Sequence, residues 1–105
     1  MGYVVDIATD ASAGIDIASR NRPDIIVSDL RMPVIDGFEF IKCIRQVSYL
    51  EGVPAIALTG ISAESELSRA IFSGFTTHLT KPVELGELIH LIEKLTATRV
   101  QRKAS

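Results

Sequence analysis

Hydrophobic and polar residues follow two alternating periodicities along the whole chain. Continuous apolar runs, typical of strands buried on both faces of a parallel sheet, occur at about Tyr3–Ile7, Ile25–Ser28, Ala55–Leu58 and Phe75–Leu79. After each run, apolar residues recur every three or four positions, as in helices with one buried face. The pattern predicts four strands, each followed by a helix.

Local signals place some helix ends. Asp10 is a suitable N-cap for the first helix, and Pro23 ends that helix because the residue before a proline avoids the α region. Alternating strands and helices predict an α/β fold, with a parallel sheet, right-handed crossovers and helices on both faces. We expect one domain over residues 1–98 and a flexible tail over residues 99–105. The last helix is predicted to bury one stripe formed by Leu85, Leu88, Ile89, Ile92 and Leu95.

Composition and charge narrow the function classes. The 105 residues are 47% apolar and 23% charged, as in a globular domain, and the net charge of −2 gives no bias toward nucleic acid or anionic membranes. No apolar run approaches the roughly 20 residues that span a bilayer, and no DNA-binding motif is present. These features predict a cytoplasmic protein with no membrane partner and no direct contact with nucleic acid. The single cysteine, Cys43, is predicted to pack as an apolar residue.

Three polar residues stand at the predicted carboxyl ends of successive strands: Asp29, Thr59 and Lys81. Parallel strands bring these ends to one edge of the sheet, so the three side chains can converge. A carboxylate can attack phosphorus, a lysine can supply positive charge to phosphoryl oxygens, and a hydroxyl can supply a directed hydrogen bond. Phosphoryl transfer would also call for a divalent cation, usually Mg²⁺, held by oxygen ligands.

A set of motifs accompanies these residues. The Asp29 strand leads into Met32-Pro33 and Asp36-Gly37, the third strand ends at Thr59-Gly60, and the fourth ends at Thr80-Lys81-Pro82. With these motifs in this order, the chain resembles the receiver domain of two-component response regulators. The resemblance implies a flavodoxin-like parallel sheet, to which this chain contributes four strands.

The resemblance also implies a role for each matching residue. Asp29 would be the phosphoacceptor, Lys81 the lysine that contacts the phosphoryl group, and Thr59 the hydroxyl that moves toward the acyl phosphate. Asp29 and the backbone carbonyl of Arg31 would bind Mg²⁺. His78 occupies the place of the family's aromatic switch residue, three positions before the lysine, and it is either a working switch or a histidine that packs in the strand.

The chain departs from the family at its beginning. Receivers usually have another strand and helix before the segment that matches Tyr3–Ile7, and the loop after that strand carries an acidic pair that holds Mg²⁺. We hypothesise that the first strand moves into the vacant place beside the Asp29 strand, where Asp6 or Asp10 partly replaces the acidic pair. Alternatively, two chains form a homodimer or exchange strands across the open edge.

Three functions follow as hypotheses. The first is a phosphorelay receiver that takes a phosphoryl group from a sensor histidine kinase or a phosphotransfer protein. Its enzymatic activity would be at most Mg²⁺-assisted self-phosphorylation and dephosphorylation. The second is a phosphorylation-impaired, receiver-derived module for protein binding or dimerisation, favoured by the missing acidic pair. The third, a nucleotide or flavin binder, is disfavoured because no glycine-rich phosphate loop follows the first strand.

Overall fold

A computed structural model describes residues 4–8, 10–32, 34–60 and 63–104 of the chain. Strands and helices alternate as the sequence pattern predicts, with a short 3₁₀ helix, η1, before the third strand. The elements are β1 (Val5–Ala8), α1 (Ala11–Asn21), β2 (Ile25–Asp29), α2 (Gly37–Gln46), η1 (Ser48–Leu50), β3 (Ala55–Thr59), α3 (Glu64–Ser73), β4 (Thr77–Thr80) and α4 (Leu85–Ala104).

The four strands form one parallel sheet in the order β1-β2-β3-β4. Val5 lies opposite Ile25, and Ala8 lies opposite Ser28, so β1 pairs directly with β2. The hypothesis that the first strand lies beside the Asp29 strand is therefore confirmed. All four strands end at the same edge of the sheet.

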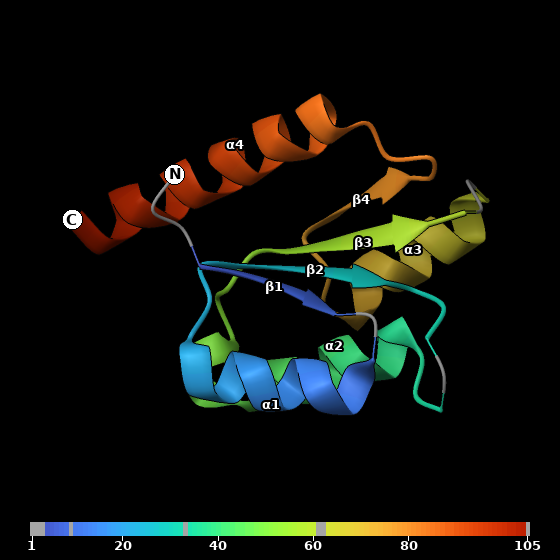
Figure 1. Ribbon diagram of the computed structural model, residues 1–105, viewed down its shortest axis with the longest axis horizontal. Coiled ribbons are helices and arrows are strands. Elements are labelled where there is room, and N and C mark those ends of the chain that lie inside the picture. Colours follow the sequence, from blue (N-terminus) through green and yellow to red (C-terminus); the bar gives the residue numbers. More distant parts are fainter. Residues whose placement is uncertain (1–3, 9, 33, 61–62, 105) are drawn as a thin grey trace.

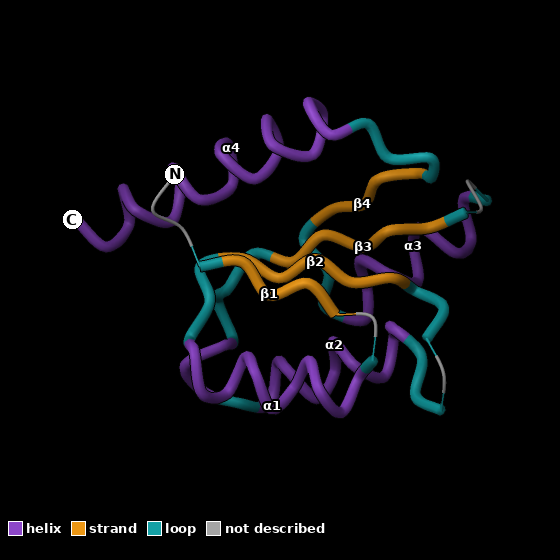
Figure 2. Tube along the Cα trace, viewed as in Figure 1, coloured by secondary structure: helices purple, strands orange, loops and turns teal. Residues whose placement is uncertain are grey.

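Helices cover both faces of this sheet. Helix α4 lies above it in Figure 1, whereas α1 and α2 lie below it. The tube in Figure 2 shows the strands as a middle layer between these helices. Helix α3 belongs to the same layer as α1 and α2, because its buried Ala70 packs in the core beneath the sheet. None of the described helices is long and apolar enough to cross a membrane.

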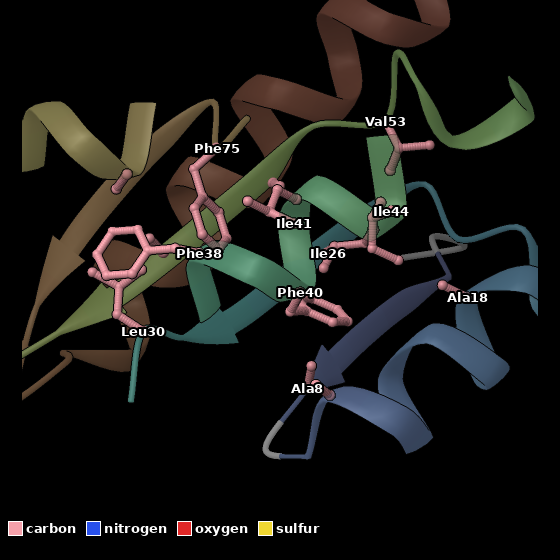
Figure 3. Close-up of a cluster of buried hydrophobic side chains, with 14 of the residues drawn as sticks. Ala8, Ala18, Ile26, Leu30, Phe38, Phe40, Ile41, Ile44, Val53 and Phe75 are labelled. Carbon is pink, nitrogen blue, oxygen red and sulfur yellow. The ribbon is translucent and has the colours of Figure 1, made fainter. Parts of the chain in front are cut away.

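The larger core lies between the sheet and the layer of α1, α2 and α3. Figure 3 shows side chains of β2 and α2, including Ile26, Phe40 and Ile41, packed together in this region. Helix α1 approaches β1 closely at Gly14, where an added Cβ would lie 2.9 Å from the Cβ of Ala8. The sequence makes this layer possible by placing small residues on α1 and large ones on α2.

The smaller core lies under α4. Its buried members are Ile25, Val27, Ile56 and Ile92, and half-buried Leu88 and Leu95 pack against them.

The predicted stripe of the last helix is wrong at its first residue, because 68% of Leu85 is exposed at the start of α4. Leu85 lies a full turn before the first residue that reaches the sheet. Helix α4 also continues into the segment predicted as a tail, as far as Ala104.

Side-chain caps and one arginine fix the helix ends beneath the sheet. Asp10 caps α1 by accepting from the Ala13 N–H at 3.1 Å, as predicted. Arg45 of α2 donates to the carbonyl of Gly74 at the end of α3, and to the carbonyls of Leu50 and Val53 before β3. Burial lowers the pKa of this guanidinium from its ordinary value, although arginine keeps its charge at neutral pH. Arg45 therefore joins three segments through one charged group.

The prediction for Cys43 is wrong, because its side chain is exposed. The buried residues of α2 are Phe38, Phe40, Ile41 and Ile44 together with Gly37. At 100° per residue, position 43 points away from the centre of that buried face. Apolar neighbours in the sequence gave a misleading signal here.

Candidate phosphorylation site

Asp29 is the last residue of β2 and lies at the carboxyl edge of the sheet. The preceding residues, from Ile25 to Ser28, are buried, and Asp29 itself is 22% exposed in its side chain. Its neighbour Leu30 donates its N–H to the carbonyl of Leu58 at 3.0 Å, so the pairing with β3 continues past the strand end. The strand therefore delivers the carboxylate to the sheet edge, with Oδ1 buried and the rest of the side chain partly open to solvent.

Lys81 reaches the same place from the end of β4. Its backbone N–H donates to the carbonyl of Thr59 at 2.7 Å, which fixes the chain where it leaves the strand. Its Nζ lies 2.5 Å from Oδ1 of Asp29, and its side chain is 46% exposed. The structure thus brings together two residues that are 52 positions apart in the sequence, and it pairs their charges at the sheet edge.

Thr59 ends β3, between the strands that carry Asp29 and Lys81. It is only 3% exposed and lies opposite Thr80 in the register with β4. His78 lies opposite Ala57, two residues before Thr59, and is half-buried. Because side chains two positions apart in a strand share a face, His78 and Thr59 lie on the same side of the sheet. The predicted switch pair therefore shares the face that α3 covers.

The loop after Asp29 is held by three contacts, only some of which the sequence motifs indicate. Asp36 caps α2 by accepting from the Glu39 N–H at 3.0 Å. A Cβ added to Gly37 would lie 2.4 Å from the backbone oxygen of Asp29, so only glycine fits against that segment. Arg31 forms an ion pair with Glu66 of α3 at 3.0 Å. The Asp36-Gly37 motif signals the first two contacts, whereas nothing in the sequence pattern pairs Arg31 with Glu66.

The oxygen ligands for a divalent cation are few in the described part of the chain. Asp29 and the backbone of Arg31 lie at the sheet edge, and Asp10 follows β1 at the same edge while capping α1. Asp6 lies opposite Ile26, three residues before Asp29, which is about 10 Å along the strand. Among the described residues, no group of three or more metal-binding side chains comes together. An ion at this edge would therefore have few protein oxygens as ligands and would need water to complete its coordination.

Asp6 is instead a buried carboxyl group in the edge strand. It is 4% exposed, and its Oδ2 has no hydrogen-bond partner among the described residues. Burial raises the pKa of Asp6, because the charged form loses its hydration. It shares the face of Ala8 and Ile26, beneath the sheet, rather than the edge where Asp29 lies. The structure does not bring Asp6 to the Asp29–Lys81 pair.

Comparison with known proteins identifies this arrangement. The family model described as the response regulator receiver domain matches residues 1–93. The chain belongs to the response regulator receiver domain family. It is therefore a receiver domain of the kind used in two-component signalling.

Relatives and solved structures agree with the family. The chain is 41% identical over 93 residues to an uncharacterised 14.6 kDa protein of Leptolyngbya boryana, with 89% of this chain and 71% of that protein covered. It spans less than half of two other curated relatives, 45% and 37% of their lengths. The receiver domain of the sensor histidine kinase PA1611 from Pseudomonas aeruginosa, solved with a magnesium ion in its active-site cleft, is 29% identical with a TM-score of 0.78. That alignment covers 86% of this chain and 74% of the other.

A second solved structure shows a receiver with its partner. It contains the Saccharomyces cerevisiae histidine phosphotransfer protein Ypd1 and the receiver domain of its downstream response regulator Ssk1. This match is 27% identical, with a TM-score of 0.78, and covers 88% of this chain and 70% of the other. The flavodoxin-like receiver fold is thus shared across these comparisons.

Proposed function

We propose that this receiver domain accepts a phosphoryl group on Asp29 from a sensor histidine kinase or a histidine phosphotransfer protein. The observation that carries the proposal is the ion pair between Asp29 and Lys81 at the carboxyl edge of the sheet, 2.5 Å from Oδ1 to Nζ. Thr59 ends the strand between them. A cytoplasmic location is part of the same proposal.

The chemistry follows from the three side chains. A carboxylate oxygen of Asp29 attacks the phosphorus of a phosphohistidine, forming an acyl phosphate while the bond from phosphorus to the imidazole nitrogen breaks. The imidazole leaves with the electron pair and takes a proton from water. Lys81, which neutralises the free carboxylate, then moves its charge to the new phosphoryl oxygens. Lys81 therefore has a partner both before and after the transfer.

Thr59 and His78 are proposed to transmit the effect of phosphorylation at Asp29 to the surface of β4. Phosphorylation of Asp29 adds negative oxygens beside the end of β3, where the hydroxyl of Thr59 can donate a hydrogen bond. His78 lies on the same face, two positions back on the neighbouring strand, and it is half-buried. A movement of Thr59 would change the space available to the imidazole of His78 and so alter the surface of β4.

Mg²⁺ is proposed as a weakly held cofactor. Asp29 and the carbonyl of Arg31 would bind it, with Asp10 as a further ligand at the same edge and water completing the shell. When bound, the ion neutralises charge on the phosphoryl oxygens. The small number of protein ligands leads us to expect a high dissociation constant and slow phosphorylation.

The test is incubation of the purified chain with Mg²⁺ and a small phosphodonor, followed by intact-mass measurement. We expect the wild type to gain the mass of one phosphoryl group, and Asp29→Asn to gain none. Lys81→Met should slow the gain while leaving the fold intact. Asp16→Asn, which removes an exposed carboxylate in α1, is the matched control and should behave as the wild type.

One outcome would overturn the proposal. If the wild type is folded but takes up no phosphoryl group from small donors or from a phosphorylated phosphotransfer protein, Asp29 is not a phosphoacceptor. The domain would then act through protein contacts alone.

A further inference from the structure

A hollow of about 380 Å³ lies between α2 and α3, in the helix layer opposite α4. We call it the α2–α3 pocket. Its lining contains two cationic side chains, three hydroxyls and one aromatic ring, and no carboxylate. The lining residues are Lys42, Ser65, Ser68, Arg69, Phe72 and Ser73.

The charged and aromatic groups of the pocket are available to a ligand. Phe72 is 95% exposed, so its ring contacts water rather than the core. The guanidinium of Arg69 lies 3.9 Å from the ring centre of Phe38, and this contact with a buried ring positions its charge. The Nζ of Lys42 lies 3.6 Å from Oε1 of Glu39, and both side chains are exposed. Such a surface ion pair contributes little to stability, so Lys42 can exchange Glu39 for the carboxylate of a ligand. The pocket therefore suits a segment that carries carboxylates around an apolar side chain.

The chain itself displays a segment of this composition at the start of α4. Glu84, Leu85 and Glu87 are all exposed, and none forms an ion pair within the described part of the chain. Leu85 is the first residue of the predicted apolar stripe, and it is exposed instead of buried. Helix α4 covers the sheet face opposite to α2 and α3 (Figure 1), so this segment and the pocket belong to opposite layers of the molecule. Only another molecule can bring the two surfaces together.

We propose that the segment Glu84–Glu87 of one molecule docks into the α2–α3 pocket of a second copy. Leu85 covers the ring of Phe72, while Glu84 and Glu87 pair with Lys42 and Arg69. The contact is head-to-tail, because the two surfaces are different, so a pair of molecules keeps a free pocket on one molecule and a free segment on the other. The surface involved is small, which places the contact among weak, concentration-dependent interactions.

Sedimentation velocity over a wide range of protein concentration tests this contact. We expect the wild type to associate as its concentration rises. A pocket variant, Lys42→Glu with Phe72→Ser, and a segment variant, Leu85→Ser with Glu87→Lys, should each weaken self-association by about tenfold or more. All four positions are exposed, so both variants should retain the circular dichroism spectrum and melting temperature of the wild type.

An equimolar mixture of the two variants gives the sharpest result. The pocket variant keeps an intact segment and the segment variant keeps an intact pocket, so the mixture should form a one-to-one complex and nothing larger. Ile7→Ser, which removes an exposed apolar residue on β1, is the control and should associate as the wild type. The proposal is overturned by a wild type that stays monomeric, by variants that still associate, by an inert mixture, or by loss of association in Ile7→Ser.

Discussion

The buried carboxyl of Asp6 should lower the stability of the receiver domain at neutral pH, and Asp6→Val should relieve this cost. Asp6 is 4% exposed on the edge strand β1, and its Oδ2 has no hydrogen-bond partner among the described residues. A buried polar atom left in this state costs about 1–3 kcal/mol, and more when charged. Valine removes that cost, favours strands and packs beside Ala8 and Ile26. We expect Asp6→Val to raise the free energy of unfolding by about 2 kcal/mol at neutral pH.

The dependence of stability on pH identifies the buried carboxyl of Asp6 as the cause of the difference between the two proteins. Burial raises the pKa of Asp6, so the folded state binds a proton more readily than the unfolded state, in which Asp titrates near 3.9. The wild type therefore has the full stability contribution of the neutral acid below about pH 3.9, and loses it as the pH rises through the raised pKa. The advantage of Asp6→Val should be small in acid and reach its full size at neutral pH.

Urea unfolding at several pH values measures the difference between the two proteins. Each measurement should be made at two protein concentrations, because an inward-pointing charge on an edge strand discourages pairing with other chains, and valine removes it. Asp16→Asn removes an exposed carboxylate, and its stability should stay within about 0.5 kcal/mol of the wild type at every pH. An Asp6→Val protein that is less stable than the wild type at neutral pH, or whose advantage does not vary with pH, would refute the reasoning.

Three further substitutions test other contacts by urea unfolding. Arg45→Met should destabilise the domain by about 3 kcal/mol, because the carbonyls of Gly74, Leu50 and Val53 lose a charged donor; a loss below 1 kcal/mol would show that Arg45 is not a structural centre. Gly37→Ala should lower the free energy of unfolding by about 1–3 kcal/mol and slow phosphorylation, since the added Cβ would meet the backbone of Asp29. Unchanged stability and an unchanged phosphorylation rate would contradict that contact. Val34→Gly should stabilise by about 1 kcal/mol, because Val34 has a φ of 69° in an exposed loop; a destabilised variant would disprove the strain.

Much of the fold could be predicted because burial and periodicity are local properties of the sequence. The alternating runs predicted the strands and helices, and the ends of parallel strands predicted that Asp29 and Lys81 meet. Asp10 was recognised as a cap from its residue type and its position before an apolar helix. These features depend on neighbours in the sequence or on the general geometry of a parallel sheet.

The features that could not be predicted depend on contacts between distant elements. Arg45 reads as an ordinary surface cation of α2, because its carbonyl partners belong to segments that only the folded chain places around it. The burial of Asp6 depends on the pairing of β1 with β2, and the exposure of Leu85 depends on where α4 first reaches the sheet. Periodicity assigns a face to each helix, but not the length over which that face has a partner.

The most direct test of the central claim is chemical trapping of the acyl phosphate. After phosphorylation with a small phosphodonor, borohydride reduces an aspartyl phosphate to homoserine, and tandem mass spectrometry of peptides locates the modified residue. The proposed function predicts homoserine at position 29 and aspartate at positions 6, 10 and 36. Homoserine at any other position, or phosphorylation without reduction at position 29, would contradict it.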